Sequence, residues 1–233
     1  EALDYEGVSW RPIGDDDWPN DVDLYIANRG DKLIPMMPHA RRTVFWIHNP
    51  AGYLLKWRYL SKLWRLKPAI IFIGTVHAGT YPAWAPDGGR YVIPYGISKD
   101  FMTAKVAAEP PAPRAVFSSN PLRSLDWLLD RWSQDIAPQV PGAELHLFTG
   151  AATYGTIGDS KAGEMAHVLS RAGKLGDQGV RVRGPVTKTQ LIEEFLSARC
   201  MLYRGDINET FCLAVGEAQA MGVPGVVQNL GSV

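Results

Sequence analysis

Two acidic residues near the carboxyl end of the chain, Glu209 and Glu217, have a spacing that suits binding chemistry. They lie in the segment NETFCLAVGEAQAMGVP, which runs from Asn208 to Pro224. If the span between them is helical, they are about 12 Å apart along the axis, too far to share one metal ion or one proton. A carboxylate is a strong acceptor, so the pair could instead contact hydroxyl groups at two ends of an extended ligand.

The same segment predicts a helix over residues 211–221. Apolar side chains recur there at helical spacing, Asn208 is a candidate cap, and Gly222 with Pro224 would end the helix. The backbone amides at the start of such a helix point outward and suit a phosphate group. This places a candidate anion site beside the first of the two carboxylates.

Each of the two carboxylates also has a simpler interpretation. Glu209 could be a first-turn acid that complements the helix dipole, and Glu217 could be solvated on an outer face. The neighbours of Glu217 are small and apolar, which favours a functional position over an exposed one.

A second candidate anion site follows an apolar run, in the segment FSSNPLRSLDWLL that starts at Phe117. Asn120 is placed to cap a helix over residues 122–136, with Pro121 at its first position. Ser118 and Ser119 add hydroxyl donors to the unpaired amides of that helix start.

Arg123 adds a cation to the first turn of this predicted helix. A cation there opposes the helix dipole, and an anionic ligand between the two would offset that cost. The alternative is a surface ion pair with Asp126 or Asp130 on the same helix.

Other residue types point to fewer functions. His48 ends the apolar run TVFWIH and is a candidate for contacting a ligand or handling a proton, although a structural histidine is equally consistent. The remaining histidines and the two cysteines, Cys200 and Cys212, lack zinc-ligand spacing, so no metal site is expected. The cysteines also lack a disulfide framework, which favours a reducing, cytoplasmic location.

Charge and hydropathy limit the partners. Lysine plus arginine and aspartate plus glutamate both number 24, so a nucleic-acid partner is not expected. No run approaches the ~20 apolar residues of a membrane span. A basic and aromatic stretch comprises Trp57, Arg58, Trp64, Arg65 and Lys67. It is a candidate for peripheral contact with the inner face of a membrane, although a plain amphipathic helix is the simpler interpretation.

The elements that must position these residues alternate between short apolar runs and amphipathic stretches, which predicts an α/β fold with mostly parallel sheets. The stretch KVAAEPPAPR contains three prolines and predicts a linker over residues 105–114. It separates an amino-terminal Rossmann-like domain, 1–104, from a carboxy-terminal one, 115–233. Predicted strands cover 24–28, 44–48, 70–76, 91–94, 115–118, 145–149, 180–183, 200–203 and 225–228; predicted helices cover 57–66, 122–136, 161–174, 188–198 and 211–221.

Taken together, these segments resemble family 4 retaining glycosyltransferases, which have the GT-B fold of two facing Rossmann-like domains. Glu209 to Pro224 is similar to the family's Glu, seven residues, Glu signature, and SSNPLRSLDWLL to its phosphate loop. The similarity continues in ELHLFTG and VRGPVTKTQL of the second domain, which resemble the family's second and third strands. It is weaker in the first domain, where it covers WIHN and VIPYGI.

The resemblance implies a metal-independent enzyme without a cofactor. The donor would be a UDP- or GDP-linked sugar, and the acceptor a saccharide, a lipid-linked or another glycan, in polysaccharide or glycoconjugate assembly. Glu209, His48 and Arg123 would be catalytic; the implied donor-binding set is Ser118, Ser119, Arg123, Gly150, Gly184, Glu209, Phe211, Cys212, Leu213 and Glu217.

Two departures from the family pattern qualify this implication. Only Arg123 remains of the two basic residues usual in the phosphate loop, and the glycine-rich loop after the first strand is not found. The first domain is therefore expected to be truncated or reduced. A non-catalytic nucleotide-sugar-binding module of a larger assembly, or a GT-B phosphorylase or epimerase, stays open as an alternative.

Overall fold

The computed structural model describes residues 3–13, 19, 21–104 and 111–233. The chain forms two compact units. The first comprises Glu1–Phe72 with Thr80–Ile93, and the second comprises Ile73–Gly79 with Pro94–Val233. The change between them at Ile93 falls before the linker expected at 105–114, of which residues 105–110 lie outside the described part. Helix α3 (Lys99–Thr103) groups with the second unit because Phe101 is buried in its core.

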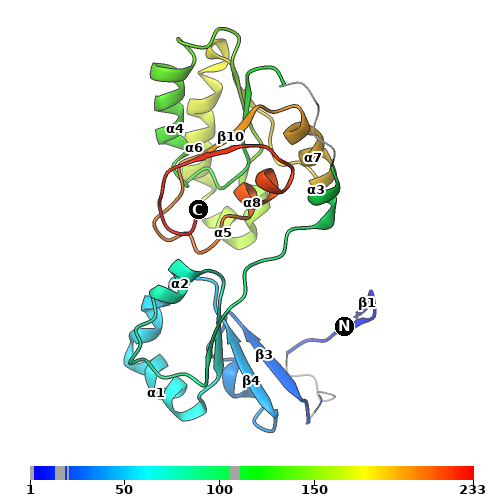
Figure 1. The fold of residues 1–233 in the computed structure, drawn as a ribbon, viewed down its shortest axis with the longest axis vertical. Helices are drawn as coiled ribbons and strands as arrows, with labels where there is room; N and C mark the ends of the chain where they lie inside the picture. The colour runs from blue at the N-terminus through cyan, green and yellow to red at the C-terminus, as the bar shows by residue number, and fades with distance from the viewer. Residues whose placement is uncertain (1–2, 14–18, 20, 105–110) are drawn as a thin grey trace. The chain divides into compact units, whose positions relative to one another are not determined.

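The first unit contains a sheet of four parallel strands that neighbour each other in chain order (Figure 1). The strands are β3 (Leu24–Asn28), β4 (Arg42–Trp46), β5 (Ala69–Phe72) and β6 (Arg90–Val92). The connections carry η1 (Ile34–Met36), η2 (Ala51–Leu55), α1 (Trp57–Leu66) and α2 (Thr75–Gly79), the last of which groups with the second unit. Phe45, Ile70 and Phe72 have no exposed surface and form the centre of this sheet's core.

A hairpin that the sequence pattern did not predict precedes this sheet. Strands β1 (Leu3–Tyr5) and β2 (Val8–Trp10) pair antiparallel. Glu6 and Gly7 connect them with φ of 50° and 77°, the left-handed values that a two-residue hairpin turn requires. All six strand residues are exposed, so the hairpin has no buried face whose alternation could have revealed it.

The second unit is a Rossmann-like domain with five parallel strands in the order β11-β10-β7-β8-β9. The strands are β7 (Arg114–Phe117), β8 (Glu144–Leu147), β9 (Val180–Val182), β10 (Cys200–Tyr203) and β11 (Gly225–Val227). Its remaining helical elements are α4 (Leu125–Arg131), η3 (Trp132–Ile136), η4 (Ala151–Tyr154), α5 (Gly155–Ser160), α6 (Ala162–Gly173), η5 (Gly176–Gln178), α7 (Lys188–Leu196) and α8 (Leu213–Ala220). The first strand in sequence therefore lies at the centre, beside the fourth.

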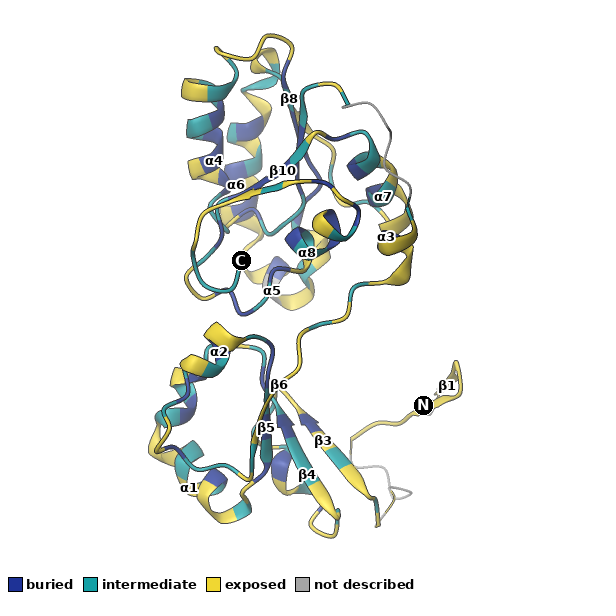
Figure 2. Cartoon of the chain, in the orientation of Figure 1, coloured by how far each residue is buried: buried dark blue, intermediate teal, exposed yellow. Residues whose placement is uncertain are grey.

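The helices pack onto this sheet through the apolar faces that the sequence pattern predicts. Helices α4 and α6 lie side by side, with their buried residues toward the strands and their exposed residues outward (Figure 2). Helix α7 begins with a capping box, in which the Thr187 hydroxyl accepts from the Gln190 amide and the Gln190 side chain bonds the Thr187 amide. All five strands and four helices predicted for this domain are present.

A buried histidine on β8 gives the second unit an expected pH dependence. His146 is 4% exposed, and its Nε2 lies 3.0 Å from Glu144 Oε2. Burial lowers the pKa of His146 from 6.5, and the hydrogen bond to Glu144 offsets only part of this. In the folded chain this histidine is harder to protonate than in the unfolded chain. As the pH falls, proton binding therefore favours the unfolded chain, and the free energy of unfolding decreases.

We therefore expect stability to be retained above about pH 6.5, the ordinary pKa of histidine. It should fall as the pH decreases from there through the lowered pKa of His146 in the folded chain. Urea midpoints at pH 7.5 and pH 5.5 check this, compared with His146→Gln, whose loss over that window should be smaller. His167→Gln, at an exposed position on α6, is the control. Equal losses for wild type and His146→Gln would contradict the assignment.

Candidate functional site

The strand order of the second unit places its reversal point between β7 and β10. The connections leave these two strands in opposite directions, so their loops diverge and open a crevice at the carboxyl edge. Ligands of open α/β sheets bind in that position. The loops concerned are 118–124 and 204–212, which carry the two segments that the sequence pattern singled out.

An ion pair joins these two loops. Arg123 Nη1 donates a hydrogen bond to Glu209 Oε2, and the Tyr203 hydroxyl donates to the same oxygen at 2.6 Å. The Glu209 side chain is 5% exposed and that of Arg123 is 42% exposed, so the carboxylate is enclosed while the guanidinium still reaches solvent. Within the described residues, Glu209 Oε1 has no hydrogen-bond partner.

The surroundings of Arg123 and Tyr203 determine the protonation states of both side chains. Burial lowers the pKa of Arg123, but the hydrogen bond and negative charge of Glu209 outweigh it, and the pKa is raised overall. Burial raises the pKa of Tyr203, and the bond to Glu209 raises it further. The tyrosine therefore stays a neutral donor, and the arginine stays a cation.

The loop geometry explains why Arg123 reaches Glu209 instead of its own helix. Asn120 Oδ1 accepts from the Leu122 amide at 2.8 Å, and Ser124 adopts a left-handed φ of 62°. The helix consequently begins at Leu125, so the predicted start at residue 122 with Asn120 as its cap is wrong. A residue in the turn before the helix can aim across to the neighbouring loop.

The surface-pair alternative for Arg123 is also wrong. Asp126 and Asp130 instead bind Arg171 of α6. These two carboxylates thus hold α4 against α6, and Arg123 pairs with Glu209 instead.

Two further hydrogen bonds join the loops of this edge. The Ser124 hydroxyl donates to the Gly205 carbonyl at 3.2 Å, and Thr149, after β8, donates to the Ser119 carbonyl at 2.5 Å. Ser118 Oγ is shielded from solvent and has no hydrogen-bond partner among the described residues. A contact from that hydroxyl to a ligand would require its side chain to rotate.

The helix behind Glu209 is shorter than predicted. It runs from Leu213 to Ala220, with Cys212 as its N-cap and no side chain bonded to its first amides. Asn208 is not its cap, because the Asn208 amide donates to Asp206 Oδ1 at 2.7 Å in a turn. Glu209 therefore lies on the loop before α8, and its separation from Glu217 is not a purely helical one.

The end of α8 agrees with the sequence pattern. Gly222 has a φ of 77°, the left-handed conformation that commonly follows a helix and that glycine adopts without strain. At the start of the helix, burial raises the pKa of the Cys212 thiol to about 11, so this cysteine is an uncharged neighbour of the first amides.

Glu217 is buried, and the solvated alternative for it is wrong. It is 6% exposed, and Lys188 Nζ lies 2.6 Å from its Oε1. Lys188 is the first residue of α7, and its ammonium group also lies 5.5 Å from the centre of the Phe101 ring. A second acid–base pair therefore accompanies the Arg123–Glu209 pair in this unit.

Three other predicted site residues lie on loops of the second unit. Gly184, after β9, has a φ of 75°, a conformation that favours glycine. A Cβ on Gly150 would lie 3.1 Å from the Pro185 ring, so these two loops approach closely. Phe211 packs edge-on against Tyr95, with ring centres 5.6 Å apart.

His48 belongs to the first unit and is described there by itself. It follows β4 at the carboxyl edge of that sheet. Its Nε2 lies 2.6 Å from Asn28 Oδ1 at the end of the neighbouring strand, and its ring centre is 5.3 Å from that of Trp46. These partners fix the orientation of the imidazole.

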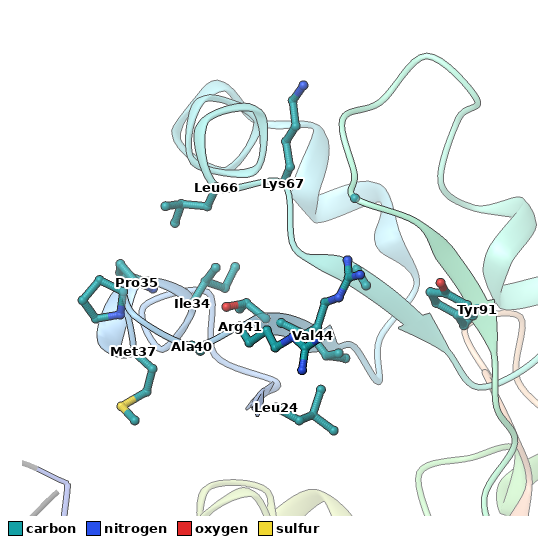
Figure 3. Close-up of a pocket in the computed structure, with 15 residues that line it drawn as sticks. Leu24, Ile34, Pro35, Met37, Ala40, Arg41, Val44, Leu66, Lys67 and Tyr91 are labelled. Carbon is teal, nitrogen blue, oxygen red and sulfur yellow. The ribbon is translucent and has the colours of Figure 1, made fainter. Parts of the chain in front are cut away.

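The first unit also has a cavity of about 810 Å³ that no sequence pattern indicated (Figure 3). Its lining includes the first residues of three strands, Leu24, Arg42 and Ala69. Figure 3 shows Leu66, at the end of α1, above Leu24, and Tyr91 of β6 at one side. This is the amino edge of the sheet, opposite the edge where α/β sheets bind their ligands.

Sequence reasoning missed two residues of the site, Tyr203 and Lys188. Tyr203 is the last residue of β10, so the rule that ligand groups follow the carboxyl ends of strands could have found it. Lys188 begins α7 three residues after Pro185, and only the tertiary fold brings it within reach of Glu217 on α8. No local pattern carries that information.

Tyr203→Phe tests the bond to Glu209. Removing one donor from a buried carboxylate is expected to destabilise the chain by about 1.5–3 kcal/mol, the usual range for a hydrogen bond to a charged group. Urea unfolding measures this. In a Glu209→Gln background the cost should shrink, because the acceptor is no longer charged. Equal costs in both backgrounds would assign the loss to packing alone.

In the described part of the chain, no group of three or more His, Cys, Asp or Glu side chains is arranged to hold a metal ion. None of the helices described is long and apolar enough to span a bilayer.

Comparison with known proteins supports the fold. No protein-family model and no curated protein sequence matches the chain. Among solved structures, sucrose-phosphate synthase from Thermosynechococcus elongatus superposes with a TM-score of 0.67 at 16% identity, over 90% of this chain and 56% of that one. Anabaena HepE in complex with UDP-glucose gives 0.66 at 16% identity, over 90% and 60%.

A third similar structure is the lipopolysaccharide outer core galactosyltransferase WaaB, with a TM-score of 0.61 at 13% identity, over 91% of this chain and 57% of that one. The chain therefore has the α/β fold of the GT-B glycosyltransferases, as the sequence predicted. It spans less than two thirds of the length of these three proteins. At these identities the likeness establishes the fold, and membership of family 4 stays a prediction.

Proposed function

We propose that the protein is a glycosyltransferase that moves a sugar from a UDP- or GDP-linked donor to a saccharide, lipid-linked or other glycan acceptor. The observation that carries the proposal is the Arg123–Glu209 pair at the reversal point of the sheet, beside the uncapped start of α8. Several proteins of this fold are glycosyltransferases, and HepE was solved with UDP-glucose.

The proposed roles follow from the chemistry of each group. Arg123 and the amides of Cys212 and Leu213 would hold the diphosphate, because a cation and a helix start both favour an anion. As the bond to the sugar breaks, negative charge develops on the leaving phosphate. Fixed donors at that position stabilise the charge most when it is fully formed, which is how they accelerate the reaction.

The carboxylates would bind the sugars on either side of the diphosphate. Oε1 of Glu209 would accept a hydrogen bond from a hydroxyl of the transferred sugar, and Glu217 would accept from the ribose hydroxyls. Lys188 would have to share or release Glu217 for that contact, since it already holds Oε1 of that carboxylate. Ser119, Gly150, Gly184 and Phe211 are proposed to line the nucleotide.

The proposed reaction retains the anomeric configuration and needs no metal ion. The leaving phosphate takes the proton of the acceptor on the face that it leaves, and Arg123 with the α8 amides supplies the positive charge that a metal would otherwise provide. We also propose that His48 contacts the transferred sugar.

The test measures release of the nucleoside diphosphate from UDP-glucose, GDP-mannose and ADP-glucose by the chain, with and without EDTA. Turnover that persists in EDTA is expected with one donor. Glu209→Ala should lose about tenfold or more, since a hydrogen bond to a charged group contributes about 1.5–3 kcal/mol. Glu193→Ala, an exposed acid on α7, is the matched control and should behave as wild type.

Calorimetry and product analysis separate the alternatives. Donor binding without turnover on any acceptor would favour a nucleotide-sugar-binding module, and a product without a new glycosidic bond would favour a phosphorylase or an epimerase. Absence of binding to all three donors contradicts the proposal. The anomeric configuration of the product, read by NMR, tests retention.

A further inference from the structure

Three exposed tryptophans form a surface on the first unit that is separate from the proposed site. Trp57, Trp64 and Trp84 are 79%, 69% and 68% exposed. Trp57 and Trp64 are seven residues apart on α1, about two turns, so they lie on the same side of the helix. Trp84 comes from the loop before β6, and the three line a groove of about 500 Å³ with Leu60 and Pro86.

The helix does not need these tryptophans for its packing. Leu63, on the other side of α1, is 1% exposed and fixes the helix to the unit. Removing large aromatic side chains from water is favourable, so a cluster of exposed tryptophans would gain free energy if a partner covered it. A contiguous exposed apolar patch of this kind marks an interaction site.

The charge around the groove is positive. Helix α1, WRYLSKLWRL, contains no acidic residue, and Lys56, Arg58, Arg65 and Lys67 at and beside it are exposed. Arg58 and Arg65 are also seven residues apart and form a row next to the tryptophans. Among the described residues these four cations make no ion pair, whereas Lys62 on the inner side binds Asp31.

The chemistry of the groove favours lipid over sugar as its occupant. Aromatic sites for sugars need acceptors for the hydroxyl groups. Among the described residues that line the groove there is no carboxylate and no side-chain amide, and the polar ones are Ser61 and Arg65. Tryptophan rings settle at the interface between lipid headgroups and hydrocarbon. Lysine and arginine beside them are attracted to anionic headgroups.

We infer that this tryptophan surface, made of Trp57, Trp64 and Trp84 with Arg58 and Arg65, docks the protein on a bilayer that contains anionic lipid. The tryptophans insert at headgroup depth, and the arginines stay at the level of the lipid phosphates. The inference stands independently of the proposed transfer activity.

Sedimentation of the chain with phospholipid vesicles tests it. We expect the protein to sediment with vesicles of phosphatidylcholine and phosphatidylglycerol, much less with phosphatidylcholine alone, and less at high salt. Exchanging both Arg58→Gln and Arg65→Gln should lower the partition coefficient about 25-fold, because each basic residue contributes about fivefold, or ~1 kcal/mol. Exchanging both Trp57→Ala and Trp64→Ala should lower it by roughly tenfold or more.

Trp10→Ala is the matched control, because Trp10 is 59% exposed on β2 and lies outside this surface. Circular dichroism confirms that each variant is folded. Equal sedimentation with neutral and mixed vesicles would overturn the inference, and so would a Trp57→Ala, Trp64→Ala variant that sediments like wild type. A shift of tryptophan emission with maltohexaose and none with vesicles would instead identify a sugar site.

Discussion

Arg123→Ala is expected to lower the turnover of the nucleotide-sugar donor by a factor of about 10² to 10³, the usual cost of removing one fixed donor to a developing negative charge. Arg123 is the cation of the site whose guanidinium still reaches solvent while bound to an enclosed carboxylate. Its loss removes charge from the phosphate position and also leaves Glu209 with Tyr203 as its remaining donor. Steady-state kinetics with the donor identified by the wild-type screen measures the effect.

Arg171→Ala is the control for Arg123→Ala. Arg171 also pairs with carboxylates in the second unit, Asp126 and Asp130, but joins α4 to α6 away from the loops of the site. We expect near-normal turnover from this variant. If both arginine variants lose activity equally, the effect reflects the general stability of the unit, and Arg123 has no role in transfer.

Trp132→Ala is expected to destabilise the chain by about 3–5 kcal/mol, the range for removing a large aromatic side chain from a core. Trp132 is 1% exposed and belongs to the core of the second unit. It begins η3, the wider turn that continues α4, and its Nε1 donates to the Gln178 carbonyl at 2.8 Å, just before β9. The side chain therefore connects the α4 layer to the edge of the sheet. Urea unfolding followed by far-UV circular dichroism measures the loss.

Two variants separate the contributions of Trp132. Trp132→Phe keeps most of the buried ring and should lose about 1 kcal/mol from the hydrogen bond, together with a smaller packing loss. Trp127→Ala, at a 40% exposed position on the adjoining helix α4, should cost much less than Trp132→Ala. A loss at Trp127 as large as that at Trp132 would contradict the assigned core.

The α/β alternation was predictable because it depends on local periodicity. Helix α1 and strands β3 and β10 have the predicted bounds, and the other predicted strands are shifted or shortened at their ends. Parallel strands in such a domain are buried on both faces, so they appear in the sequence as short, continuous apolar runs. The hairpin β1–β2 lacks such a run and was missed.

The site was predictable in its residues more than in its geometry. The sequence pattern selected Arg123 and Glu209, and the strand order brings them together at the reversal point. The local structure predicted around Arg123 was wrong, because the Asn120 side chain bonds the Leu122 amide and holds the segment in a turn where helix was expected. The cap predicted for the second helix was also wrong, because the Asn208 amide bonds Asp206 in a turn and the helix begins only at Leu213. Such turns compete with helix starts and use the same residue types.

The partners of the two glutamates could not be predicted, because they come from other elements. Tyr203 reaches Glu209 from the end of a strand, and Lys188 reaches Glu217 from a different helix. Contacts of this kind depend on how elements pack, and a single sequence carries no periodic trace of them.

The two hydrogen bonds that Oε2 of Glu209 accepts have a stereochemical consequence. With that oxygen held by a guanidinium and a phenol, the carboxylate cannot turn, and its other oxygen becomes an acceptor of fixed direction. An acceptor of this kind satisfies a hydroxyl that points one way from a sugar ring and leaves the inverted hydroxyl without a partner. Epimers at that carbon would then differ in binding by a buried, unpaired polar group, which costs about 1–3 kcal/mol.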